Sequence, residues 1–158
     1  MDLFLDCEWA DVLASELVSI ALVSGDLQSI FYAERDPLPV DPTPWVRSVV
    51  YPLLDRGASA MTDTSMTVAI RQFLASFEVS KIHYDFGPDR SLCQFVIDGF
   101  DVLDPPGPAP GNVEWYRCDG LSKAIEAWWS AHPVRKLKRH HALMDAMALR
   151  AAYLDDLG

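Results

Sequence analysis

The chain has 158 residues, of which 50% are hydrophobic, and a formal net charge of −10 at pH 7. This length favours a single domain over residues 1–158. The sequence has no long uncharged apolar run and no basic N-terminal segment, so we expect neither a membrane-spanning helix nor a signal peptide. Because an acidic surface repels phosphate, the charge argues against nucleic-acid binding unless divalent metal or a local cluster of bases reverses the field.

The first third of the chain predicts an antiparallel meander. Residues 2–9 are apolar on both faces, as expected of a strand in the interior of a sheet. Residues 16–23 (ELVSIALV) predict a second strand, and residues 28–33 (QSIFYA) predict a third after a turn at Gly25 and Asp26. Three consecutive strands with short connections would pair as neighbours.

Helical elements dominate the remainder. The expected helices span residues 45–54, 62–77, 89–97, 119–131 and 141–155. One further strand is expected at residues 79–86, and two proline-rich segments, residues 36–44 and 101–112, are expected to be loops. A meander followed by these elements predicts the α/β class, with a mixed central β-sheet flanked by α-helices.

The three cysteines, Cys7, Cys93 and Cys118, are widely spaced and form no C-x-x-C pair. An odd number of cysteines at such spacings argues against a disulfide framework and against a zinc site. The cysteine content therefore favours a reduced, cytoplasmic protein.

Asp6 and Glu8 lie two residues apart on the first expected strand. A period of two places both carboxylates on one face and turns Leu5, Cys7 and Trp9 to the other. Two buried acids side by side are costly without a positive partner, so a bound cation between them is one interpretation. The other is that the strand ends there and both acids are solvated.

Asp89 follows the strand at residues 79–86 and opens the next helix, with apolar Leu92 and Cys93 three and four residues on. An N-cap is the ordinary role of an aspartate there, and a metal ligand is the alternative. Asp85 is a competing candidate, but position 88, three residues after it, is a proline. We expect the Asp89 carboxyl to lie nearer Asp6 than the Asp85 carboxyl does. Asp85 would then contact the metal ligands without binding the metal itself.

His140 and Asp145 open the last expected helix, after a basic stretch formed by Arg135, Lys136, Lys138 and Arg139. On one ideal helix, residues five apart point about 140° away from each other, so both reach one site only if His140 lies on the loop before the helix. The alternatives are a surface histidine and an acid that stabilises the helix dipole. The basic stretch would hold phosphates or form a solvated loop.

These three pieces together resemble the DEDDh 3′→5′ exonuclease family, which has the ribonuclease H-like fold. LFLDCEWA resembles its D-x-E motif, PDRSLCQFV its middle aspartate motif, and HHALMDAMAL its H-x-A-x-x-D-A motif. Within the family the chain is most similar to the small bacterial RNase AS-type exoribonucleases, on the evidence of Trp9, the ELVSIALV strand and the LCQ after Asp89. Cys7 stands where threonine is more usual and Pro88 where an aromatic is common, which bears on substrate preference.

The resemblance implies two-metal-ion hydrolysis of single-stranded RNA from its 3′ end, releasing nucleoside 5′-monophosphates. Asp6, Glu8, Asp89 and Asp145 would hold two Mg²⁺ or Mn²⁺ ions, with Asp6 bridging them, and His140 would be the general base. Substrate contacts are expected from Cys7, Trp9, Lys138 and Arg139, although Trp9 fits core packing equally well. We further expect a homodimer, with Trp128 and Trp129 serving helix packing or the dimer contact.

Three other functions stay open on the sequence. Single-stranded DNA is an alternative substrate, since no residue can be assigned to the RNA 2′-hydroxyl. A catalytically inactive module that binds nucleic acid or a partner is a second, although none of the acids is missing. A zinc hydrolase using His140 or His141 is disfavoured, because the pattern lacks thiolates and two histidines at helical i, i+4 spacing.

Overall fold

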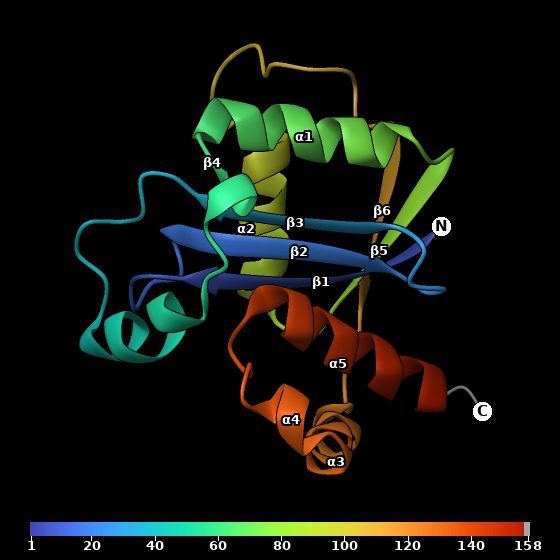
Figure 1. The fold of residues 1–158 in the computed structure, drawn as a ribbon. Helices are drawn as coiled ribbons and strands as arrows, with labels where there is room; N and C mark the ends of the chain where they lie inside the picture. The colour runs from blue at the N-terminus through green and yellow to red at the C-terminus, as the bar shows by residue number, and fades with distance from the viewer. Residues whose placement is uncertain (157–158) are drawn as a thin grey trace.

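A computed structural model describes residues 1–156, which build a mixed six-stranded sheet between layers of helix (Figure 1). The antiparallel meander is formed by β1 (Asp2–Trp9), β2 (Leu17–Ser24) and β3 (Ile30–Arg35). β1 lies between β2 and β5 in the strand order β4-β3-β2-β1-β5-β6, so the prediction of an interior first strand is confirmed.

The parallel part of the sheet continues beyond β1. β5 (Val79–Tyr84) pairs in parallel with β1, and β6 (Asn112–Arg117) pairs in parallel with β5 along its whole length. At the other edge, the two-residue β4 (Ala60–Met61) pairs in parallel with β3. Because β1, β5 and β6 run the same way, their carboxyl ends lie at one edge of the sheet.

Strands β6 and β4 were absent from the sequence prediction, which is wrong at both places. Along β6 the residues are half-buried or exposed, without the clean alternation that marks a strand. The complete ladder with β5 stabilises this strand, and that pairing partner is not visible in the local sequence.

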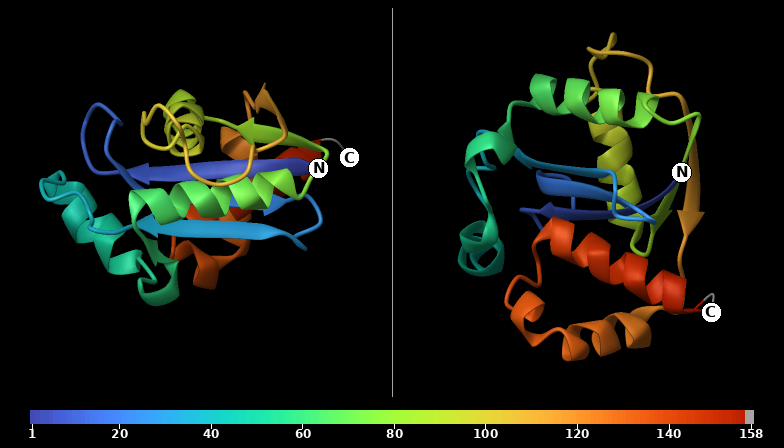
Figure 2. Two further views of the ribbon diagram at one scale, coloured as in Figure 1. Left: turned by 90° about the horizontal axis from the view of Figure 1, so that it is seen from above. Right: turned by 45° about the vertical axis from the view of Figure 1, so that its right-hand side comes forward.

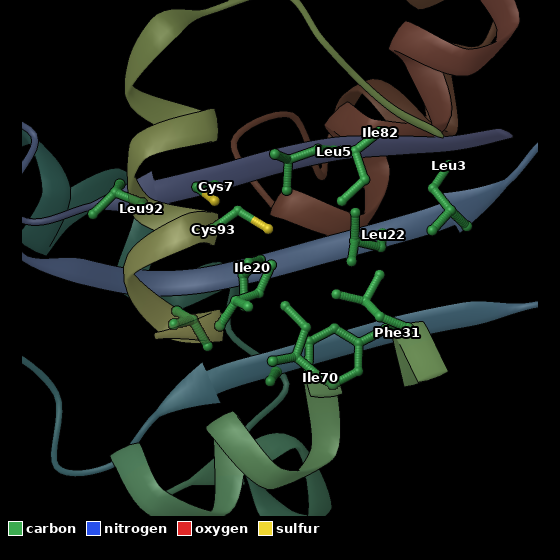
Figure 3. Close-up of a cluster of buried hydrophobic side chains, with 14 of the residues drawn as sticks. Leu3, Leu5, Cys7, Ile20, Leu22, Phe31, Ile70, Ile82, Leu92 and Cys93 are labelled. Carbon is green, nitrogen blue, oxygen red and sulfur yellow. The ribbon is translucent and has the colours of Figure 1, made fainter. Parts of the chain in front are cut away.

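One face of the sheet is covered by α1 (Asp63–Ala75) and α2 (Gly87–Ile97). Leu3, Leu5 and Cys7 of β1 point into the core between the sheet and these helices (Figure 3). The Thr62 hydroxyl accepts a hydrogen bond from the Ser65 N–H and so caps α1, as its position predicted.

The opposite face is covered by α5 (Ala142–Asp156), with α3 (Ser122–Ala131) packed against α5 and the short α4 (Pro133–Lys136) beside it (Figure 2). Alanines of α5 pack closely on Phe4 of β1. Within residues 1–156, every helix falls short of the length and apolar character that a bilayer crossing requires.

The expected helix at residues 45–54 is irregular. It consists of a π-helical turn, Val46–Val50, and a 3₁₀ turn, Tyr51–Leu53. Pro52 has no N–H to continue an α-helical ladder, which explains the change of helix type. The basic stretch, expected to be a loop, begins inside α4.

Candidate metal and catalytic centre

A cavity of about 500 Å³ opens at the carboxyl end of β1. The residues predicted to be catalytic all line it, although they come from β1, α2, the turn before α5 and α5 itself. They are Asp6, Glu8, Asp89, His140 and Asp145. Asp85 lines the same cavity. Residues from the first and the last segments of the chain therefore meet at one edge of the sheet, where β1 ends.

β1 supplies the first two acids on the face that looks toward α5, while its apolar alternate residues fill the core on the other face. Glu8 is only 9% exposed. One carboxylate oxygen of Asp6, Oδ2, is buried and has no hydrogen-bond partner among the described residues. A buried carboxylate oxygen without a partner is costly, so Asp6 is not fully satisfied by the protein itself.

The pKa values of this cluster are raised. Burial is the largest cause of the raised pKa of Asp6, followed by the charges of Asp145, Asp89 and Glu8. Burial, Asp145 and Asp89 raise the pKa of Glu8 to about 9. Burial raises the pKa of Asp145 to about 7, although the backbone N–H of His140 and the charge of Arg139 oppose the shift. Close, buried acids favour protonation unless a cation joins them.

His140 lies in the turn directly before α5, as its predicted role requires. Its backbone has a left-handed φ of 73°, and its N–H donates to Asp145 Oδ2 at 3.0 Å. Ligand-capable atoms of Glu8, His140 and Asp145 lie within 4.8 Å of one another. Burial, and then the charge of Arg139, lower the pKa of the His140 imidazole, which keeps the ring neutral and able to accept a proton.

His141 points away from the cavity. Its ring is buried, stacks on Tyr32 at 4.6 Å between centroids, and brings Nε2 to 3.4 Å from Asp55 Oδ2. The prediction that only the first of the two histidines faces the acids agrees with this geometry.

Asp89 is 2% exposed and lies in the first turn of α2. Its Oδ1 accepts a hydrogen bond from the backbone N–H of Cys7 at 3.1 Å, which ties α2 to the strand that carries Asp6. After burial and the charge of Asp145, the charge of Asp89 contributes more to the raised pKa of Asp6 than that of Asp85 does. That the Asp89 carboxyl is the nearer of the two to Asp6 stays a prediction. Burial, and then the charge of Asp85, raise the pKa of Asp89, although the backbone N–H of Cys7 opposes the shift.

Aromatic side chains form the walls of the cavity. Trp9 stacks on Phe86, with centroids 5.9 Å apart and planes inclined by 14°. Trp45 contacts the His140 ring edge-on at 4.9 Å and is 49% exposed. The sequence prediction missed Phe86 and Trp45 as cavity residues. A tryptophan beside a proline-rich loop was the only available signal for Trp45.

The other predicted substrate-contact residues are engaged in contacts within the protein, although Arg139 also lines a smaller cavity together with Asp6, His140 and Asp145. The Cys7 thiol lies in the hydrophobic core beside Cys93 (Figure 3), with Sγ 3.7 Å from the Asp89 carbonyl oxygen, and the Cys7 backbone N–H donates to the Asp89 carboxylate. The Arg139 guanidinium forms an ion pair with Glu126, and Lys138 Nζ lies 3.8 Å from Asp55 Oδ1. Strand alternation turns the Cys7 thiol inward, and acids distant in sequence attract the two bases.

The donor set fits hard divalent cations. Six carboxylates line the cavity without a compensating base in ion-pair contact among the described residues, and oxygen ligands are those that Mg²⁺ and Mn²⁺ prefer. A cation there would satisfy Asp6 Oδ2 and lower the raised pKa values.

Comparison of the chain with protein-family models and with curated protein sequences found no match.

Proposed function

We propose that this chain is a divalent-metal-dependent 3′→5′ exonuclease with a ribonuclease H-like fold, acting on single-stranded nucleic acid. One observation carries the proposal: four acids and a histidine from distant segments line one cavity, with a buried Asp6 oxygen that has no partner among the described residues. The mixed sheet, with its meander extended by parallel strands, is compatible with such a domain.

Each residue receives a role in this proposal. Asp6, Glu8, Asp89 and Asp145 would hold two Mg²⁺ or Mn²⁺ ions. When bound, such ions neutralise phosphate charge, activate water and stabilise the leaving 3′-oxygen. His140, held through its backbone by Asp145, would accept the proton of the attacking water.

The aromatic walls support a single-stranded substrate. Stacking on Trp9, Phe86 or Trp45 needs an unpaired base, and aromatic faces accept any base. RNA is the favoured substrate on the resemblance, and DNA is the second candidate. We also propose that the chain is a cytoplasmic homodimer, and light scattering on the purified chain tests the oligomeric state.

The test uses matched RNA and DNA oligomers labelled at either end, incubated with Mg²⁺, Mn²⁺ or EDTA. We expect a 5′-labelled RNA to shorten stepwise in Mg²⁺ or Mn²⁺, a 3′-labelled RNA to release labelled mononucleotide at once, and neither to change in EDTA. Internal cleavage, or metal-independent cleavage, would contradict the proposal. Binding without hydrolysis in every metal would favour the inactive-module alternative.

A further inference from the structure

A second, basic cavity lies on the other side of the segment that joins β5 to α2. Its volume is about 490 Å³, and its lining includes Tyr84, Gly87, Arg90 and Arg117. The intervening residues of the same segment, Asp85 and Phe86, line the acidic cavity instead. The two cavities therefore share one wall, at the edge of the sheet where β5 and β6 end.

Arg90 has a free and oriented guanidinium. It lies on α2, one residue after Asp89, and is exposed to solvent. Its Cζ is 5.7 Å from the centroid of the Trp115 ring, and no described carboxylate or carbonyl receives a hydrogen bond from it. A guanidinium held on an aromatic face keeps its N–H edges available, and these edges match phosphate geometry.

Arg117 approaches the same cavity from the last position of β6. Its Nε lies 3.0 Å from Asp119 Oδ1, and both side chains are largely exposed, at 59% and 76%. An exposed ion pair of this kind is weak, so a multiply charged ligand can compete for the arginine.

These two arginines line the same cavity and are only lightly engaged. Several other arginines are committed to the fold: Arg35 binds Asp63, Arg56 binds Glu34, and Arg139 binds Glu126. In a protein of net charge −10, two lightly engaged guanidinium groups in one cavity form a local attractive field for an anion.

We infer that the Arg90–Arg117 cavity binds a backbone phosphate of the substrate, on the 5′ side of the bond that is cut. This inference rests on the proposed function. The strand would pass from the acidic cavity over Phe86 into the basic one, with its terminal nucleotide among the metal ligands. The ligand is a single-stranded oligonucleotide long enough to cover both cavities.

The test compares binding of a uridine dinucleotide and a uridine octanucleotide by fluorescence anisotropy, in Ca²⁺ and again in EDTA, with no turnover required. The variants are Arg90→Ala, Arg117→Ala and, as a matched charge control, Lys81→Ala. Lys81 is an exposed residue of β5 on the opposite face of the sheet from Tyr84.

We expect each arginine variant to bind the octanucleotide about three- to tenfold more weakly and the dinucleotide unchanged. The slope of log affinity against log salt should fall in magnitude by about 0.7 for each phosphate that is no longer bound, and Lys81→Ala should leave it unaltered. Equal losses with Lys81→Ala, equal losses for both ligands, no loss, or no octanucleotide binding by the wild-type chain would overturn the subsite.

Hydrolysis is scored separately, so that the two ideas fail independently. A wild-type chain that cleaves oligomers while the arginine variants bind them normally keeps the exonuclease and removes the subsite. A chain that cleaves nothing in any metal, yet loses octanucleotide affinity and salt dependence in the arginine variants, keeps the phosphate subsite and removes the proposed hydrolysis.

Discussion

Two acids of the sheet, each with a buried carboxylate oxygen, differ in how the protein satisfies them. Glu34 on β3 is fully buried and accepts hydrogen bonds from the backbone N–H groups of Asp55 and Arg56, at 2.6 and 2.8 Å, and from the Tyr32 hydroxyl at 2.6 Å. Asp6 on β1 has a buried oxygen with no partner among the described residues and faces further acids.

The difference shows that burial of a carboxylate does not by itself mark a functional site. Glu34 completes a structural network, in which Arg56 also contributes a charge at 3.4 Å. We propose that a cation completes the Asp6 cluster, because an incomplete buried polar cluster destabilises the fold unless a ligand completes it. Neutralising Asp6 should therefore remove activity and keep or raise stability, whereas neutralising Glu34 should lower stability.

The largest expected effect follows neutralisation of the cavity acids. Asp6→Asn or Asp145→Asn should abolish metal-dependent hydrolysis, a loss of at least about 10³-fold, because each removes an oxygen ligand. Without metal, either variant should be as stable as the wild type or more stable, since like-charge repulsion is relieved. Oligomer cleavage and thermal unfolding in EDTA measure the two effects. Full activity in both variants would contradict the metal centre.

His140→Ala should lower turnover by about 10²–10⁴-fold while metal binding survives, as expected for loss of a general base. The acid limb of the wild-type pH–rate profile should lie below the ordinary imidazole pKa of about 6.5, because burial lowers the pKa of His140, and only this variant should lose that limb.

The matched control is His141→Ala, assayed well below its thermal midpoint because the ring is buried against Tyr32. Its turnover should change far less. A larger loss from His141→Ala would show that His141, and not His140, is the general base. Equal losses would mean that both histidines act through the structure of the turn.

The satisfied acid should respond in the opposite sense. Glu34→Gln places an amide NH₂ against N–H and O–H donors and leaves Arg56 without its buried partner, so it should lower the free energy of unfolding by about 2–4 kcal/mol. Asp36→Asn, which affects the exposed partner of the same arginine, should cost less than about 1 kcal/mol. Urea denaturation measures the free energy of unfolding of both variants. A Glu34→Gln variant as stable as the wild type would contradict the stated difference between Glu34 and Asp6.

The smallest expected effect is the pH dependence of stability in EDTA. The folded-state pKa values of Glu8, about 9, and Asp145, about 7, exceed the values of unfolded carboxyl groups. The folded state therefore holds extra protons, and their stabilisation is complete near pH 4 and is lost as pH rises through 7 and then 9.

We expect the metal-free chain to lose about 1 kcal/mol or more between pH 5 and pH 9, or roughly 2–4 °C in thermal midpoint. Saturating Mg²⁺ should flatten this profile, and Asp145→Asn should flatten its lower part. A midpoint that rises steadily with pH in EDTA would show that the acids are not coupled as their positions imply.

Local patterns along the chain were enough to predict the elements that position the candidate site. Alternation along residues 2–9 placed Asp6 and Glu8 on one face of an interior strand, and the five-residue spacing required His140 to lie before the last helix. The apolar register after Asp89 favoured it over Asp85. The placements of Asp6, Glu8 and His140 succeeded because each depends on periodicity within a few residues, whereas the choice of Asp89 over Asp85 stays a prediction.

Other features came from packing between distant segments. β6 depends on its ladder with β5, Arg139 on its attraction to Glu126, and the Trp9–Phe86 stack on the meeting of two strand ends. The unsatisfied oxygen of Asp6 and the satisfied carboxylate of Glu34 differ only in which distant groups the fold brings to them. Such contacts arise only when the tertiary structure forms, so they cannot be predicted from local periodicity.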